Sequence, residues 1–345
     1  MKKGKSRVMV VVVLSMAFAG CEQMLMPKPS AATPTEVFDC LWHGVDERYS
    51  MFDVKGVEWQ EVYDTMRPKV WDGMGDDSLF AVCAAMLSLL RDGHVNLYGG
   101  YDVSHSERVY ERFYEEGQID IDAVVLGYLG ADYRTAGGIA YNVLSEGRVV
   151  YMRYSSFNGS ASVGVMRHIL QQYPRAQGMI FDIRGNGGGS VEEVINVLRI
   201  FASHGQQLYS SQIKTGVGHE EFSTPQATYA PISEDNEVYR GKIVVLTDRG
   251  SYSAASLLAL CCMAYPEVTL MGDTTSGGLG LPATYLLPNG WRYRIPVTRL
   301  LTPSGINLEE GVAPDRVVLL DKAAARDERK DNIIETATLL ICDGQ

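Results

Sequence analysis

The chain has 345 residues, 46% hydrophobic and 21% charged, a composition typical of a globular protein with one large or two modest domains. Its formal net charge is -11 at pH 7. Binding to a phosphate backbone needs basic patches, so this acidic chain is a poor candidate for a nucleic-acid partner.

The N-terminus has the features of an export signal. Residues 1–20 start with a basic segment and continue with an apolar run, which is typical of a secretory signal peptide and too short for a membrane-spanning helix. The run ends in FAGC, which resembles a bacterial lipobox and implies cleavage before a lipidated Cys21. An ordinary signal peptide is the alternative. With residues 21–34 as a lipidated tether, we expect an exported protein held to the bacterial cell envelope, on its periplasmic or surface face, by its lipid alone.

Residues 35–98 read as a helical subdomain. Apolar residues recur at helical spacing in three segments, and the third segment ends at Asp92-Gly93-His94. A lone histidine at a helix end is ordinarily a cap or a surface residue. The five cysteines after Cys21 lie in apolar contexts without CxxC spacing, so we expect neither a metal site nor a cofactor.

The middle of the chain, 99–145, carries no strong motif and reads as a connecting region. We expect a helix near 106–116 and strands near 121–127 and 138–144.

From 146 to 345 strands and helices alternate, which predicts an α/β core with a parallel sheet. The expected strands are 148–153, 178–183, 242–247 and 267–271, and the expected helices are 161–173, 190–203 and 254–264. Pro288-Asn289-Gly290 predicts a hairpin over 284–297, and a last amphipathic helix is expected over 323–341.

Two stretches of this core have chemical potential. In KIVVLTDRGSYSAASLL, 242–258, a buried strand turns into a helix that begins among Ser251, Ser253 and Ser256. Backbone N–H groups at such a helix start can stabilise an oxyanion, although serine is also an ordinary N-cap. In GMIFDIRGNGGGS, 178–190, three glycines let the backbone approach a ligand closely, and the spacing fits no phosphate-binding motif.

Together these stretches resemble the S41 peptidase family, which includes the C-terminal processing proteases and the tricorn core protease. The resemblance rests on four motifs in order, namely Asp182-x-Arg184-x-Asn186-x-Gly188-Gly189, Ser251 to Ser256, Met271 to Gly277, and Gly311-Val312-Ala313-Pro314-Asp315. It implies a ClpP/crotonase-like spiral core with an N-terminal helical bundle, and a serine endopeptidase acting on peptides or unfolded proteins. The 99–145 region is too short for the PDZ domain that many processing proteases carry.

The resemblance also implies site residues. The family pattern selects Ser253 as nucleophile, with Ser251 as the alternative if the alignment slips. Gly278 stands where the processing proteases have their lysine base, and 243–321 contains no lysine, so the tricorn-like branch and its histidine base, His94, fit better.

The supporting acid of that branch precedes the Gly311 motif, and the register leaves Glu309 or Glu310, with Glu309 favoured. The oxyanion hole would combine the N–H of Ala254 with that of Gly187 or Gly188. Asp182, Arg184 and Asn186 more readily shape the loop than react.

Two other functions stay open. One is a catalytically inactive lipoprotein of the same fold that binds a peptide or an apolar ligand, and the other is a crotonase-like acyl-CoA enzyme. The presence of both Ser253 and His94 favours the peptidase, and an exported address makes coenzyme A a poor partner.

Overall fold

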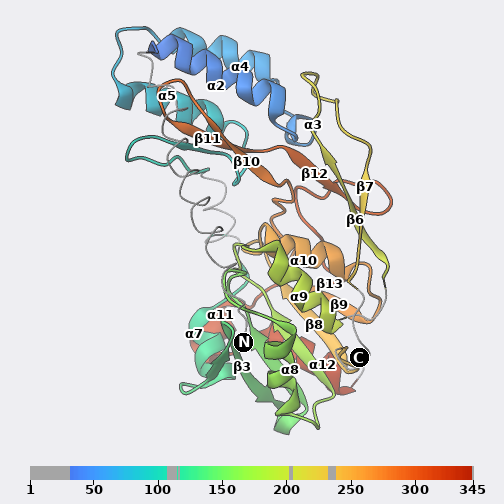
Figure 1. The fold of residues 1–345 in the computed structure, drawn as a ribbon. Helices are drawn as coiled ribbons and strands as arrows, with labels where there is room; N and C mark the ends of the chain where they lie inside the picture. Colours follow the sequence, from blue (N-terminus) through green and yellow to red (C-terminus); the bar gives the residue numbers. More distant parts are fainter. Residues whose placement is uncertain (1–31, 107–114, 116, 202–204, 232–237, 344–345) are drawn as a thin grey trace, which may run out of the picture.

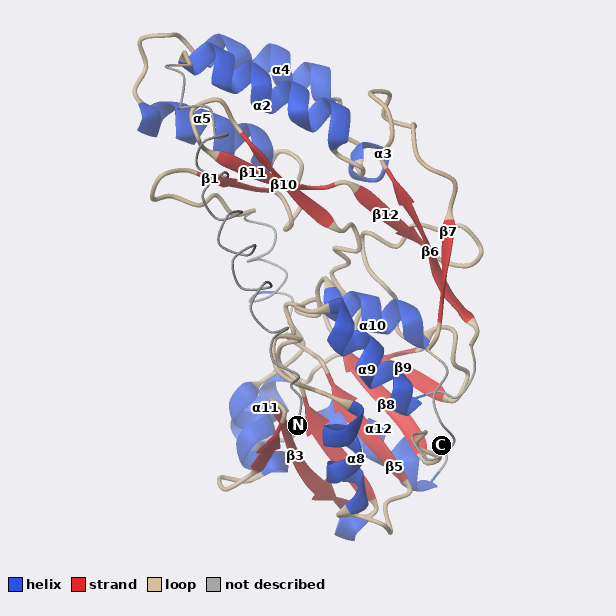
Figure 2. Ribbon diagram, viewed as in Figure 1, coloured by secondary structure: helices blue, strands red, loops and turns tan. Residues whose placement is uncertain are grey.

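The computed structural model describes residues 32–106, 115, 117–201, 205–231 and 238–343. These residues form two lobes (Figure 1), which we call the helical lobe and the sheet lobe. The helical lobe holds helices α2 to α5, and the sheet lobe holds a mostly parallel sheet covered by helices on both faces (Figure 2). The predicted α/β core with an N-terminal helical region is therefore confirmed.

The sheet lobe is built on seven strands of the described ranges. In spatial order they are β13 (Arg316–Val317), β9 (Val268–Gly272), β8 (Lys242–Thr247), β5 (Gly178–Asp182), β4 (Val149–Arg153), β3 (Ile139–Leu144) and β2 (Arg134–Ala136). The first five are parallel, and four of them, β9, β8, β5 and β4, were predicted as such, whereas β13 was not predicted. Strands β3 and β2 pair antiparallel. The sheet is mixed because only residues 145–148 separate β3 from β4, and so short a connection permits antiparallel pairing alone.

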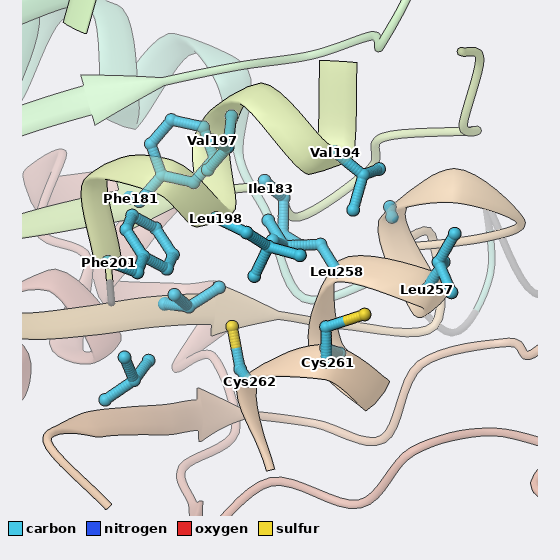
Figure 3. Close-up of a cluster of buried hydrophobic side chains, with 14 of the residues drawn as sticks. Phe181, Ile183, Val194, Val197, Leu198, Phe201, Leu257, Leu258, Cys261 and Cys262 are labelled. Atoms are coloured by element: carbon cyan, nitrogen blue, oxygen red, sulfur yellow. The ribbon is translucent and has the colours of Figure 1, made fainter. Parts of the chain in front are cut away.

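Alternate residues of the central strands enter two apolar layers. On one face lie α8 (Val163–Gln171), α9 (Val191–Phe201) and α10 (Ala254–Cys262), and on the other α7 (Ile121–Val124), α11 (Lys322–Glu328) and α12 (Asn332–Asp343). In β8, for example, Val245 packs on the first face and Val244 on the second. Figure 3 shows α9 and α10 meeting through Val194, Leu198, Leu258 and Cys261. This packing fixes the start of α10, where Ser253 lies.

Two local predictions are wrong. The expected strand at 121–127 is helix α7 followed by the π-helical turn η3 (Val125–Leu129), because Asp120 caps the helix and its apolar side packs on α11 and α12. The expected single helix at 323–341 is divided, since Arg329 adopts a left-handed φ of 55° between α11 and α12. The expected helix near 106–116 lies almost wholly outside the described residues.

The helical lobe has its own apolar core. Helices α2 (Pro34–Arg48), α3 (Phe52–Lys55), α4 (Trp59–Met66), η1 (Arg67–Lys69) and α5 (Asp76–Ser88) cover a sheet of order β1 (Asn96–Tyr98), β11 (Arg292–Pro296), β10 (Pro282–Leu286). The predicted hairpin at 284–297 is thus β10–β11, and its Tyr293 and Ile295 pack among the helices. A second small sheet, β12 (Thr298–Leu301), β6 (Gln207–Ile213) and β7 (Gln226–Tyr229), reaches α10 (Figure 2). Among the helices of the described ranges, none combines the length and apolar character that crossing a bilayer requires.

A buried charge network holds the strand end before the triple glycine. Arg184 is fully buried and donates to Asp182 from Nε and Nη2, at 3.0 and 2.6 Å. Its Nη1 donates to Asp331 Oδ2 at 2.8 Å, and the other oxygen of Asp331 accepts from two backbone N–H groups at the start of α12. The C-terminal helix is therefore tied to the loop that leads into the site.

Replacing Asp331 with alanine should lower the free energy of unfolding by about 3 to 5 kcal/mol, because removing one partner of a buried ion pair leaves charge uncompensated. Urea unfolding followed by circular dichroism measures the effect. Asp327→Ala is the matched control, since Asp327 forms a solvent-exposed pair with Arg326 and its loss should leave the midpoint unchanged. Equal midpoints for the two variants would contradict the assigned role of Asp331.

Candidate active site

Ser253 lies at a sharp turn between β8 and α10, with unusual backbone angles. Its φ is 56° and its ψ is -116°, a conformation that residues with a side chain rarely adopt. The turn is held from both sides, because Ser253 N donates to Gly277 O at 2.8 Å and Leu257 N donates to Ser253 O at 2.8 Å. Such a strained strand-to-helix turn presents a hydroxyl at the end of a sheet.

His94 comes to this serine from the helical lobe. It follows α5, two residues before β1, and its Nε2 lies 3.0 Å from Ser253 Oγ across 159 residues of sequence. Asp92 fixes the backbone here: its Oδ1 accepts from His94 N at 2.8 Å, and its Oδ2 accepts from the Tyr49 hydroxyl at 2.8 Å. The structure thus joins Ser253 and His94, which were selected from separate motifs.

The surroundings of His94 favour the neutral ring. Burial lowers the pKa of His94, the Asp92 carboxylate opposes that shift, and the positive charges of Arg294 and Lys55 add to it. Its Nδ1 is buried and makes no hydrogen bond of normal geometry with any described residue. A neutral imidazole at pH 7 can accept a proton from the serine hydroxyl.

Neither of the two predicted supporting acids forms a hydrogen bond with the His94 ring. Glu309 is buried, and its Oε2 accepts from the backbone N–H groups of Leu279 and Gly280 at 2.7 and 3.1 Å. Its Oε1 lies 3.8 Å from Lys55 Nζ, while the half-exposed Glu310 pairs with the same lysine. Each predicted acid thus has other polar partners, and support of the His94 ring by Glu309 or Glu310 stays a prediction.

Glu309 therefore holds the loop beside the site. Burial, together with the nearby Asp92 carboxylate, raises the pKa of Glu309 to about 8, and Lys55 opposes the shift. One oxygen of Glu309 accepts two backbone N–H groups, an arrangement that either protonation state of the carboxyl permits. These two hydrogen bonds to the Leu279–Gly280 backbone point to a positioning role for Glu309.

Glu309→Gln should keep the fold and much of the function of the site, because the glutamine carbonyl can accept the same two N–H groups. Glu309→Ala should lose at least about 2 kcal/mol of unfolding free energy, since two buried donors lose their acceptor. Chemical denaturation of both variants, with activity measured in parallel, separates the roles. If Glu309→Gln proves as damaging to turnover as loss of His94, the charge of Glu309 is needed.

The glycine loop lies directly against the serine. A Cβ on Gly188 would fall 2.8 Å from Ser253 Cβ, which explains the need for glycine there. The N–H of Gly188 donates to Asn186 Oδ1 at 2.9 Å, so the predicted use of Gly188 as an oxyanion donor does not fit this arrangement. The N–H groups of Ala254, Gly187 and Gly189 make no hydrogen bond with described residues.

Of these three, Ala254 and Gly189 share a cavity with the serine, and sequence reasoning did not select Gly189. The cavity measures about 120 Å³. It is lined by His94, Gly189, Val191, Ser253, Ala254, Leu257, Gly278, Leu279, Leu281, Pro282, Arg294 and Leu300. Its walls are mostly aliphatic, with one cation, Arg294. Within the described ranges no three His, Cys, Asp or Glu residues are grouped to hold a metal ion.

Comparisons with known proteins identify the family of this chain. The model of Peptidase family S41 matches residues 148–318, and that of the Tricorn protease C1 domain matches residues 30–88. A solved structure from Parabacteroides merdae, described as a candidate peptidase, is 32% identical with a TM-score of 0.84, covering 91% of this chain and 98% of its own. The chain belongs to peptidase family S41.

More distant S41 relatives share less. A chloroplastic C-terminal processing peptidase from Tetradesmus obliquus is 25% identical over 53% of this chain, and a carboxyl-terminal-processing protease from Synechocystis is 27% identical over 49%. The matches cover 39% and 38% of those relatives, so this chain corresponds to about two fifths of their length. The structure of mature CPAF, 12% identical with a TM-score of 0.68, shows the same fold.

Proposed function

We propose that this S41 family member is a serine endopeptidase that cleaves peptides or unfolded proteins, with Ser253 as nucleophile and His94 as general base. The observation that carries the proposal is the 3.0 Å approach of His94 Nε2 to Ser253 Oγ. The serine also lies in a strained turn and lines a cavity, a combination that an ordinary helix cap does not need.

The reaction follows from the positions of these groups. Ser253 Oγ attacks the peptide carbonyl carbon as its proton passes to His94 Nε2, and the carbonyl oxygen becomes an oxyanion. The N–H of Ala254, with Gly187 or Gly189, stabilises that charge, each donor contributing about 3 kcal/mol. His94 then gives the proton to the leaving amine, and water, activated by the same ring, hydrolyses the acyl-enzyme.

Of the charged groups around His94, Asp92 stabilises the protonated ring most strongly. It is the only carboxylate of the described ranges that hydrogen-bonds to His94, although through the backbone N–H. Among the charges around the ring its effect on the His94 pKa is the largest and is favourable to the imidazolium. Glu309 does not bond to the ring and instead holds the Leu279–Gly280 backbone, which lies beside the site.

A fluorophosphonate probe tests the proposal against a non-catalytic, ligand-binding role. The probe should label the purified protein at Ser253, as shown by peptide mapping, and labelling should vanish in His94→Ala. An unlabelled protein with the native circular dichroism spectrum would favour the inactive peptide- or apolar-ligand-binding alternative.

We also propose that the mature protein is a lipoprotein that begins at Cys21. The support is the order of basic segment, apolar run and FAGC in the sequence. Mass spectrometry of the protein extracted from its native membrane should find a diacylglyceryl group on Cys21. An unmodified N-terminus that starts elsewhere would overturn this proposal, and the proposed peptidase mechanism would be unaffected.

A further inference from the structure

Arg294 brings a positive charge into the catalytic cavity, where no carboxylate of the described residues forms an ion pair with it. Its only hydrogen bond within the described ranges is a long one, from Nη1 to Asn96 Oδ1 at 3.4 Å. None of the ion pairs formed by described residues includes it, and the other walls of the cavity are mainly aliphatic. A partly buried charge in apolar surroundings is costly unless it is paired, so this cation is prepared for an anion from outside the protein.

The strand register points Arg294 toward the site. Arg294 pairs with Asn96 of β1 on one side and with Thr284 of β10 on the other, so these three side chains form a row on one face of the sheet. The neighbours of Arg294 along β11, Tyr293 and Ile295, face the opposite way into the helical core. The row that contains Arg294 therefore faces away from the helices, where Ser253 and His94 lie.

The adjoining strand offers a track for a peptide. β10 is an edge of its sheet, and it is bonded to β11 through odd-numbered residues, as the pairs Leu287 N to Trp291 O and Val297 N to Leu281 O show. The backbone polar groups of Pro282 and Thr284 thus point away from β11, and no backbone group in the described ranges forms a hydrogen bond with them. An extended peptide added to this edge would start at the cavity, because Pro282 also lines it.

We propose that Arg294 binds a carboxylate of the peptide substrate close to the scissile bond. The inference rests on the proposed peptidase function and specifies its substrate class. The carboxylate comes from one of two sources, the C-terminus of the peptide or the side chain of an aspartate or glutamate near the cleaved bond. A guanidinium can bind either with two parallel hydrogen bonds.

Matched fluorogenic peptides test this on the full-length protein. A series that places the scissile bond one to three residues from the C-terminus is made with a free carboxylate or with an amide, and an internal series carries glutamate or glutamine near the bond. At pH 8, where the His94 ring is neutral in all variants, the wild type should favour one carboxylate form by about 10- to 100-fold in kcat/KM. Arg294→Gln should bring that ratio close to 1.

Arg292→Gln is the control. Arg292 lies two residues away on the same strand and face, is exposed, and stacks over Tyr98 outside the cavity, so its removal should leave the selectivity ratio intact. If Arg294→Gln loses selectivity only in the C-terminal series, Arg294 binds the C-terminal carboxylate. If it loses selectivity only in the internal series, Arg294 binds a glutamate or aspartate side chain. A wild-type ratio near 1 in both series, or an unchanged ratio in Arg294→Gln, overturns the inference.

A binding measurement separates this inference from the proposed function. In Ser253→Ala, fluorescence anisotropy with the same labelled peptides should show tighter binding of the carboxylate form, and the double variant with Arg294→Gln should not. Hydrolysis without a preference for the carboxylate form would support the proposed peptidase function and reject the role of Arg294. Selective binding without any hydrolysis by the wild type would support Arg294 and reject the peptidase.

Discussion

Ser253→Ala should reduce peptide hydrolysis by a factor on the order of 10⁶ while the protein stays folded. Loss of a serine nucleophile that works with a histidine base has an effect of this size, because the remaining groups cannot form the acyl-enzyme. Initial rates measured with a peptide library, together with a thermal unfolding curve, give the two readouts.

A glycine at the same position gives a sharper version of the experiment. Ser253 has a φ of 56°, which strains any residue with a Cβ, so Ser253→Gly should be equally inactive but more stable than Ser253→Ala by about 1 kcal/mol. Ser251 is the control for the alternative nucleophile: it is buried, and its hydroxyl donates to Ile183 O at 2.8 Å. Full activity in Ser253→Ala would show that Ser253 is not the nucleophile.

His94→Ala should be nearly as damaging as Ser253→Ala, because the members of such a unit depend on one another. The base must be neutral to accept the proton, so kcat/KM should be constant at high pH and fall with acid along a single ionisation. Burial lowers the pKa of His94, which places that acid limb below 6.5. The activity is thus expected to persist into mildly acidic solution.

Two variants test the assignment of that limb. Asp92→Asn removes the charge that opposes the shift, so the limb should move to still lower pH. His219→Ala is the matched control, since His219 pairs with Asp46 at 2.9 Å in an exposed position, and it should change neither the rate nor the profile. A limb above about pH 7.5, or an active His94→Ala, would mean that another group takes the proton.

The two reacting residues of the candidate site could be predicted from the sequence because each lies in a short motif. Ser253 and His94 lie in local patterns whose backbone geometry follows from strand, turn and helix signals. The supporting acid could not be predicted in this way. The direction of the Glu309 side chain depends on two N–H groups, at Leu279 and Gly280, and on Lys55 at the end of α3. Such long-range contacts leave no trace in the spacing of residues.

The wrong predictions have a similar cause. The run Ala123-Val124-Val125-Leu126 suits a strand as well as a helix, and the choice was made by Asp120 and by the apolar surface of α11 and α12. Likewise, the hydrogen bond from Gly188 N to Asn186 Oδ1 depends on the direction of the Asn186 side chain, which the spacing of the motif does not reveal. Local pattern thus predicted the core of the fold, and tertiary packing decided the remainder.

The helical lobe is completed by the hairpin β10–β11, which is made after the nucleophile in the order of synthesis. Leu287, Trp291, Tyr293 and Ile295 belong to the apolar core that supports α5 and, through it, the segment that bears His94. A growing chain that has reached only Ser253 therefore lacks the surface on which its base is positioned. The pairing of His94 with Ser253 therefore requires a segment that is synthesised after both of them, because Tyr293 and Ile295 belong to the core beneath α5.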